Sequence, residues 1–463
     1  MNKKKSLEFN KIDVKFVIFI FLLSLIITTN LLVFFMRPSG FSQGDSWAYG
    51  YGDFRNWDQL SFTGNSLRKW PIVLINSILG NSTLQILFQS IISMLSWSYL
   101  LITLKKVYNN NLLINTMVTI LASNPYVTSW NTIQLSESYA ISFLVLLVSI
   151  SIRIKSNDST KLRFYLVLVL VLFLNTKPSN LISAIIIFAL FALFNSRKLI
   201  FQGPNKFLII SVILIIAYSA FLSINQSNQK LQEEGFGITY TAAQAVSVIS
   251  NTNPKAAKLT STLPDIDALA CLKEYYLEKP ETITHALKTK CFESQEWLDE
   301  NFNKYYAKFL ISNPIYVFEL VSISILAGNS PYSTYGGTVS ILPASFEGIY
   351  FGNRNYALRL DNFSAQNIPI EKLQVNAPII LWILLFLTVS VFSRSKYFQD
   401  VSNQRSKIFM FNYLFTFGGS IIISTAIIVP NEWYRQTIVG QVSIFIATIL
   451  IWAENLKHRQ KTS

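Results

Sequence analysis

Residues 14–36 read VKFVIFIFLLSLIITTNLLVFFM, an apolar run with a single lysine and no acidic residue. A helix needs about 20 mostly apolar residues to cross the hydrocarbon core of a bilayer, and this run meets that length. It is too long for a secretory signal peptide and is not followed by a small-residue cleavage site. We therefore expect it to be the first helix of a membrane protein.

The whole chain has the composition of a membrane protein with many spans. Of its 463 residues, 51% are hydrophobic and only 14% are charged, which is unusual for a soluble enzyme. The same length criterion predicts ten spanning helices. They cover residues 14–36, 82–104, 112–130, 137–153, 164–175, 180–195, 207–223, 378–393, 408–430 and 440–454.

The distribution of positive charge predicts the orientation of these helices. With the N-terminus inside, the cytoplasmic segments hold more than half of the 39 Lys and Arg residues, in agreement with the positive-inside rule. The formal net charge of +14 then reflects membrane topology, and we predict no nucleic-acid partner. We expect an integral protein of the plasma (inner) membrane with both termini cytoplasmic.

The predicted fold class is an all-α polytopic membrane protein in three parts. Residues 1–223 form a seven-helix core, which includes a first outer loop at 37–81. Residues 224–377 form a mixed, mainly helical extracytoplasmic domain between the seventh and eighth spans. Residues 378–463 contain the three closing helices.

The outer domain holds both cysteines of the chain, Cys271 and Cys291. Two cysteines outside the cytoplasm favour a disulfide, and the alternative is a pair of free thiols. The same domain contains an apolar run at 312–328 that is short for a span and includes Glu319. We expect this run either to lie in the membrane interface or to pack into the core.

The first outer loop contains the stretch QGDSWAYGYGDFRNWD at 43–58, whose Gly50-Tyr51-Gly52-Asp53 matches part of a potassium-channel filter. A filter needs a short pore helix before the stacked carbonyls. Pro38, Gly40 and Gly44 disfavour such a helix here. The channel interpretation is therefore disfavoured, and a catalytic loop and a polar turn are the other two interpretations.

Four ionisable residues are predicted to lie at the same outer boundary of the bundle. Asp45 follows the first span and Glu137 opens the fourth. Lys177 lies in the NTKPSN break between the fifth and sixth, and Arg435 lies between the ninth and tenth. Ionisable groups at membrane helices are rare and mark functional sites, so the four form a candidate site.

The chain resembles the GT-C superfamily of polytopic glycosyltransferases, which includes the dolichyl-phosphate-mannose protein mannosyltransferases and bacterial lipid-linked-sugar transferases. The resemblance rests on Gly44-Asp45-Ser46, on Tyr49, on Arg-Lys-Trp-Pro at 68–71 and on Ser-Glu-Ser at 136–138. It covers the first 195 or so residues best, and the rest in layout. Two positions depart from the family pattern: Ser46 stands where a second acid is common, and Lys177 where an arginine is common.

The resemblance implies an inverting transfer of a sugar from a polyprenyl-phosphate carrier to a glycan, lipid or protein acceptor. Asp45 would act as the general base. Lys177 and Arg435 would bind the donor phosphate, and Glu137 would orient the acceptor or Arg435. Each residue also has an ordinary structural reading, as a turn residue, a helix-dipole partner, a snorkelling cation or a boundary residue.

The remaining site residues of this prediction bind substrate in the first outer loop. They are Tyr49, Asp53, Trp57 and Arg68. The aromatic rings could stack on sugar faces, or form an interfacial aromatic belt.

No cofactor is predicted with certainty. A divalent cation shared by Asp45 and Glu137 stays open, because two carboxylates are a weak signal. With only His285 and His458 in the chain, neither a histidine-based metal site nor a Ser-His-Asp triad can be assembled in the membrane core.

Two other functions compete with the transferase. One is a polysaccharide polymerase or O-antigen-ligase-like enzyme, whose essential residues would lie in the late outer loop. The other is a transporter or flippase of lipid-linked sugars without covalent chemistry.

Overall fold

The computed structural model describes the helical parts of the chain. The described residues are 14–36, 38–40, 70–109, 111–156, 159–177, 179–186, 210–211, 213–221, 267, 269–271, 290–318, 321, 414–424 and 433–462. They form helices and the short turns between them, and this part of the chain contains no strand. The predicted all-helical fold is confirmed for these residues.

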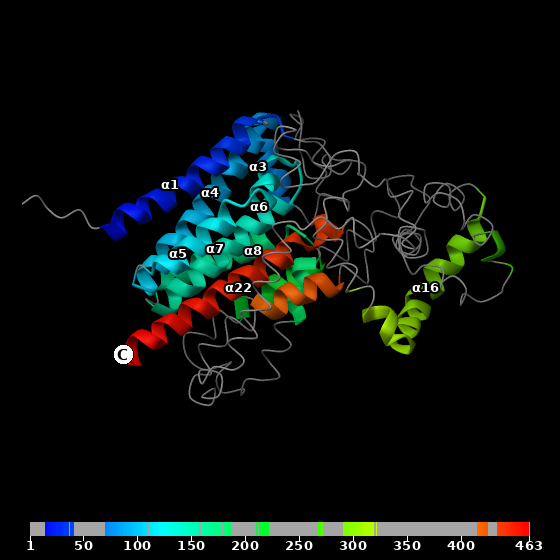
Figure 1. Ribbon diagram of the computed structural model, residues 1–463. Helices are drawn as coiled ribbons and strands as arrows, with labels where there is room; N and C mark the ends of the chain where they lie inside the picture. The colour runs from blue at the N-terminus through cyan, green and yellow to red at the C-terminus, as the bar shows by residue number, and fades with distance from the viewer. Residues whose placement is uncertain are drawn as a thin grey trace, which may run out of the picture.

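Five long helices lie side by side in a bundle (Figure 1). They are α1 (Val14–Met36), α4 (Ser82–Val107), α7 (Glu137–Ser156), α8 (Thr160–Leu174) and α22 (Trp433–Thr462). Helix α7 is central, because it packs against α4, α8 and α22. The shorter helix α5 (Leu112–Ala122) packs against α1, α4 and α22.

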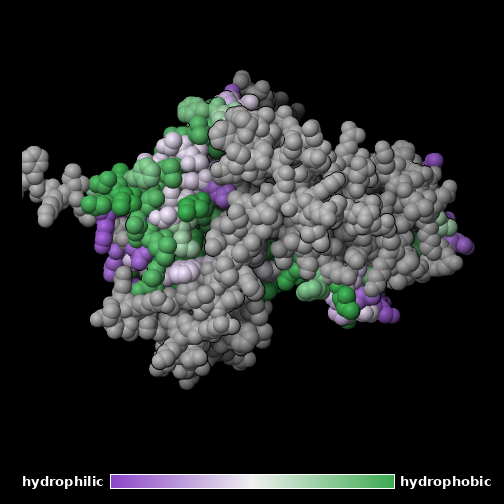
Figure 2. Space-filling view, viewed as in Figure 1, coloured by the Kyte–Doolittle hydropathy of each residue, from purple (hydrophilic) through white to green (hydrophobic). Residues whose placement is uncertain are grey.

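Within the described residues, four helices are long and apolar enough to cross a membrane. These stretches are Val14–Met36, Ser82–Val107, Glu137–Ile154 and Thr437–Glu454. Helix α1 exposes large apolar side chains such as Phe21 and Phe35, and Figure 2 shows a hydrophobic surface over this side of the bundle. Such a surface suits contact with lipid and not with water. These helices and this surface indicate that the protein inserts into a membrane. The ten spans and the three-part layout stay predictions.

The predicted span at 112–130 is wrong as a single helix. Helix α5 ends at Ala122, and Ser123 caps it. A proline follows at 125, and the residue before a proline is disfavoured in the helical region. The chain continues as the short helix α6 (Pro125–Thr128) and the 3-10 turn η3 (Ser129–Thr132). The segment 123–136 thus connects α5 to α7.

The other predicted spans are seen to different extents. Helices α1, α4, α7 and α22 contain the predicted first, second, fourth and tenth spans. The fifth corresponds to the 15-residue helix α8, and the ninth to the shorter helix Leu414–Ser424. The sixth and seventh lie only partly within the described residues, and 378–393 lies outside them.

One end of the bundle is held together by cations. Lys105 of α4 lies over the ring of Phe19 of α1, 3.7 Å from its centroid. Lys457 of α22 donates a hydrogen bond to the carbonyl of Val107 at the end of α4, at 3.2 Å. A positive charge at a helix C-terminus is favoured by the helix dipole. The C-terminal ends of α4 and α22 therefore lie together at the N-terminal end of α1.

Helix Leu414–Ser424 packs on α22 through two glycines. A methyl group at Gly418 would lie 2.5 Å from the carbonyl oxygen of Gly440, and one at Gly440 would lie 2.8 Å from that of Gly418. Small residues at helix interfaces allow this close backbone approach in membrane proteins. The neighbouring Gly419 has nothing within 4 Å of such a methyl group.

We expect Gly418→Ala to destabilise the protein by about 1–3 kcal/mol, because the two backbones must separate to admit the methyl group. Gly419→Ala is the matched control, since the same substitution one residue away meets open space. Thermal unfolding of the purified variants in detergent measures the difference. Equal midpoints for the two variants would contradict the close packing.

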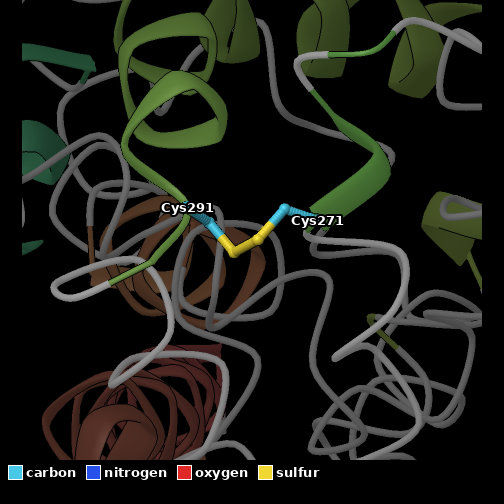
Figure 3. The surroundings of a disulfide bond; sticks show 2 residues. All are labelled: Cys271 and Cys291. Carbon is cyan, nitrogen blue, oxygen red and sulfur yellow. A yellow bond between two sulfur atoms is a disulfide. The ribbon is translucent and has the colours of Figure 1, made fainter.

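Helix α16 (Phe292–Ser312) belongs to the predicted outer domain and lies apart from the bundle in Figure 1. Cys271 and Cys291 form a disulfide, with their Cα atoms 5.7 Å apart. Figure 3 shows that the bond joins a short helical segment to the start of α16. One face of α16 is buried, where Phe302 stacks on Tyr306. Burial raises the pKa of the Tyr306 phenol, and the nearby Tyr316 raises it further, so this face stays uncharged.

Candidate functional site

The structure describes only some of the residues predicted to form the site. Asp45, Tyr49, Asp53, Trp57 and Arg68 all lie outside the described residues. Arg435 lies in the first turn of α22, whose described side chains begin at Thr437.

Glu137 and Lys177 form a buried ion pair. The Nζ atom of Lys177 lies 2.8 Å from Oε1 of Glu137, and the two side chains are 3% and 0% exposed. They are 40 positions apart in the chain: Glu137 begins α7, and Lys177 lies in the turn that follows α8. Removing two charges from water is costly, and a close pair offsets much of that cost. The structure therefore brings together two of the four predicted ionisable residues.

Local sequence explains why both side chains reach this point. Helix α8 ends at Leu174, and the Asn175 backbone N–H caps it by donating to the carbonyls of Phe173 and Val171. Lys177 follows within the turn, and Asn180 holds that turn by donating to Oγ1 of Thr176 at 2.8 Å. Pro178 follows Lys177 directly and disfavours helix there.

Glu137 is the first residue of α7, and this end of the helix lies beside the turn that carries Lys177. Its carboxylate is favoured there by the positive end of the helix dipole as well as by the lysine. The ordinary reading of Glu137 as a dipole partner is therefore compatible with its role in the ion pair.

The residue after Glu137 extends the polar contacts toward α1. Ser138 donates to Oδ1 of Asn131 at 2.7 Å, and Asn131 donates to Oδ1 of Asn30 at 2.7 Å. All three side chains are at most 2% exposed. A buried amide or hydroxyl needs such partners because it has lost its contacts with water.

The next residue extends the contacts toward the short helix α3 (Trp70–Leu79). Tyr139 donates to Oδ1 of Asn76 at 2.9 Å, and Gln85 of α4 donates to the Asn76 carbonyl at 2.7 Å. Residues 137 to 139 thus each contact a different part of the bundle. We call the side chains of Asn30, Asn76, Asn131, Glu137, Ser138, Tyr139 and Lys177 the polar layer.

The side chains of the polar layer are buried within the bundle. Asn30 precedes the end of α1 at Met36 by six residues, or about 9 Å at 1.5 Å per residue. The irregular segment 129–136, which supplies Asn131, is buried throughout. At membrane depth, non-helical backbone is found where it is buried in protein or lines a water-filled cavity.

Four members of the polar layer were not predicted from the sequence: Asn30, Asn76, Asn131 and Tyr139. Ser138 was named only as part of the Ser-Glu-Ser motif. A usable signal was present, because Asn30 is an amide within a largely apolar membrane span, and strongly polar side chains in such spans usually face the bundle interior. The sequence alone does not say which polar residue meets which.

The described part of the layer is a fixed, desolvated pair of opposite charges surrounded by amides and hydroxyls. An ammonium group in a water-poor site acts more strongly on an anion than one in water. Among the described residues, no group of three or more His, Cys, Asp or Glu side chains is placed to hold a metal ion.

Comparison with known proteins adds no relative. No protein-family model, curated protein or solved structure matches the chain. The resemblance to GT-C transferases rests on the short motifs of the first 195 or so residues.

Proposed function

We propose that this protein is a membrane glycosyltransferase of GT-C type, which moves a sugar from a polyprenyl-phosphate carrier to an extracytoplasmic acceptor. The observation that carries the proposal is the buried ion pair of Glu137 and Lys177 within the polar layer. Both residues were predicted from the sequence to belong to the site, Glu137 in the Ser-Glu-Ser motif and Lys177 in the break between two predicted spans, where the family commonly has an arginine. A desolvated lysine is suited to the charge that develops on a phosphate leaving group.

The proposed reaction is a displacement at the anomeric carbon of the donor sugar. The acceptor oxygen or nitrogen forms the new bond to that carbon while the bond to the carrier phosphate breaks. Asp45 takes the proton of the acceptor, and the phosphate leaves with the electron pair of the broken bond. Lys177 and Arg435 stabilise that phosphate, and attack from the opposite face inverts the anomeric configuration.

Glu137 acts on Lys177 in this scheme. In the absence of donor, the carboxylate holds the ammonium group in place and offsets its charge. Because the carboxylate already fixes the ammonium group, Lys177 needs little reorganisation when a donor phosphate competes for it. Tyr49, Asp53, Trp57 and Arg68 of the first outer loop contact the sugar or the acceptor.

The proposed setting is the plasma membrane, with ten spans, both termini in the cytoplasm and the disulfide-linked domain outside. Four helices of membrane length support this setting. In that orientation the polar layer and the disulfide lie toward the same, outer side of the membrane. A disulfide is suited to this oxidising compartment.

Turnover of a lipid-linked sugar by the pure protein tests the function. Purified protein in detergent is incubated with polyprenyl-phosphate sugars carrying a radiolabelled monosaccharide, with a membrane extract as acceptor source. We expect label to leave the lipid phase with wild-type protein and to stay there with Asp45→Asn. A cooperative unfolding transition shows that the purified protein is folded. If such protein leaves the donor unchanged with every labelled sugar, the proposal is overturned.

A lipid-linked-sugar transporter is the second candidate. The observation that favours it is the charged pair and the irregular backbone within a helical bundle, because transporters use both features to bind substrates. A transporter moves label across the bilayer of a proteoliposome and leaves the sugar–phosphate bond intact. The chemical identity of the labelled product therefore separates the two functions.

A further inference from the structure

The exposed side of helix α16 carries acids in its first half and lysines in its second half, with exposed apolar side chains at both ends, Phe292 at the start and Ile311 at the end. Glu293, Glu296 and Glu300 are exposed in its first half, and Lys304 and Lys308 follow one turn apart. Ile311 completes the series at its end. The spacing of three or four residues keeps these positions on one face of a helix.

The apolar end of this series is unusually exposed. Ile311 is 83% exposed. Helical residues 314–318 follow α16 after Asn313, and they expose Ile315 and Phe318, each at 72%. Clusters of large apolar side chains on a surface mark contact sites. Figure 2 shows hydrophobic side chains beside hydrophilic ones in the part of the view that α16 occupies.

The opposite face of the same segment is already packed. Phe309 lies edge-on to Tyr316, with ring centroids 5.0 Å apart, and both are buried. Tyr316 therefore anchors the turn that carries Ile315 and Phe318. The disulfide at Cys291 fixes the other end of α16. The exposed apolar side chains therefore lie on a helical segment that is fixed by packing of its opposite face and by the disulfide.

We infer that the C-terminal end of α16 inserts into the surface of a bilayer that contains anionic lipid. Apolar side chains of interfacial helices sink about 5–10 Å below the headgroups. Lys308 precedes Ile311 by about one turn, so its ammonium group lies nearer the headgroups when Ile311 is inserted, where anionic lipids attract it. Glu300 and the earlier acids then stay in water. A membrane is available to α16, because the described part of the same chain contains four helices of membrane length.

The inference stands apart from the transferase activity, since it uses no residue of the polar layer. It assigns a role to one end of the apolar run at 312–328, for which the sequence left interface and core both open. It makes α16 a second point of contact between the chain and the membrane.

An environment-sensitive dye measures the insertion. Ile311→Cys and the matched control Glu300→Cys lie on the same face of α16, about 16 Å apart along its axis. No free cysteine competes for the label in the described structure, because Cys271 and Cys291 are bonded. Each variant of the full chain is labelled with a nitrobenzoxadiazole dye in nanodiscs of equal parts phosphatidylcholine and phosphatidylglycerol.

We expect the dye at position 311 to emit at shorter wavelength, to be quenched by doxyl-labelled lipid, and to be quenched by aqueous iodide several-fold less than the dye at 300. Replacing both Lys304 and Lys308 by glutamine should weaken the lipid quenching at 311. Equal iodide quenching at the two positions would place the apolar end in water. Protection of position 311 from both quenchers would place it against protein. Either result overturns the inference.

Discussion

Lys177→Met is expected to destabilise the protein by about 3–5 kcal/mol, which is the usual effect of breaking a buried ion pair by removing one partner. The substitution leaves the Glu137 carboxylate buried without the ammonium group that lies 2.8 Å away. Glu137→Gln should have a loss of the same order, because the lysine charge is then uncompensated. Chemical unfolding of the purified variants in detergent measures both losses.

The double variant Glu137→Gln/Lys177→Met separates pairing from packing. It removes both charges and keeps the side-chain volumes close to the original ones, so most of the lost stability should return. Lys161→Met is the control, because Lys161 is exposed on α8 and exposed charges contribute little. If the two single losses simply add in the double variant, the pair does not contribute through its charges.

Asp45→Asn is expected to lower sugar transfer by roughly 10²–10⁴-fold, the range supplied by a general base. The amide keeps the shape of the side chain and cannot take the acceptor proton. The measurement compares glycan and lipid-linked-sugar profiles of deletion cells carrying wild type or the variant at matched expression. The variant should behave like the deletion, which loses a glycoconjugate and accumulates its donor.

Asp58→Asn provides the matched control in the same loop and should complement fully. Full complementation by Asp45→Asn as well would contradict the assignment of the base. A triple replacement of His285, Arg354 and Arg359 tests the competing polymerase, whose essential residues would lie in the outer domain. Loss of product in that triple variant alone would favour the polymerase over the transferase.

Part of the candidate site could be predicted because the relevant signals are local. Glu137 and Lys177 were selected as ionisable residues at the ends of apolar runs, and the structure pairs them. Their neighbours Asn131 and Tyr139 were not selected, since their partners Asn30 and Asn76 lie 101 and 63 positions away. Hydrogen bonds over such distances depend on how helices pack, and no local pattern records them.

The helix boundaries show the same division. The apolar stretch at 112–130 was expected to continue as one helix, because hydropathy averages over its polar residues. The break after Ala122 depends on Ser123 and on the proline at 125, and these signals were available in the sequence. The close approach of Gly418 and Gly440 was not, because a glycine at an interface and one facing open space look alike in a sequence.

The sequence by itself determined that this is a helical chain with apolar helices of membrane length. The length and composition of an apolar run are local properties, and transfer of such a run out of water is favourable. It also determined the order of acids, lysines and apolar residues along α16. Only the tertiary structure decided that Glu137 meets Lys177 and that three consecutive residues of α7 contact three different parts of the bundle. The reason is that burying a polar group requires a partner, and the choice of partner is made by the packing of helices that are distant in the chain.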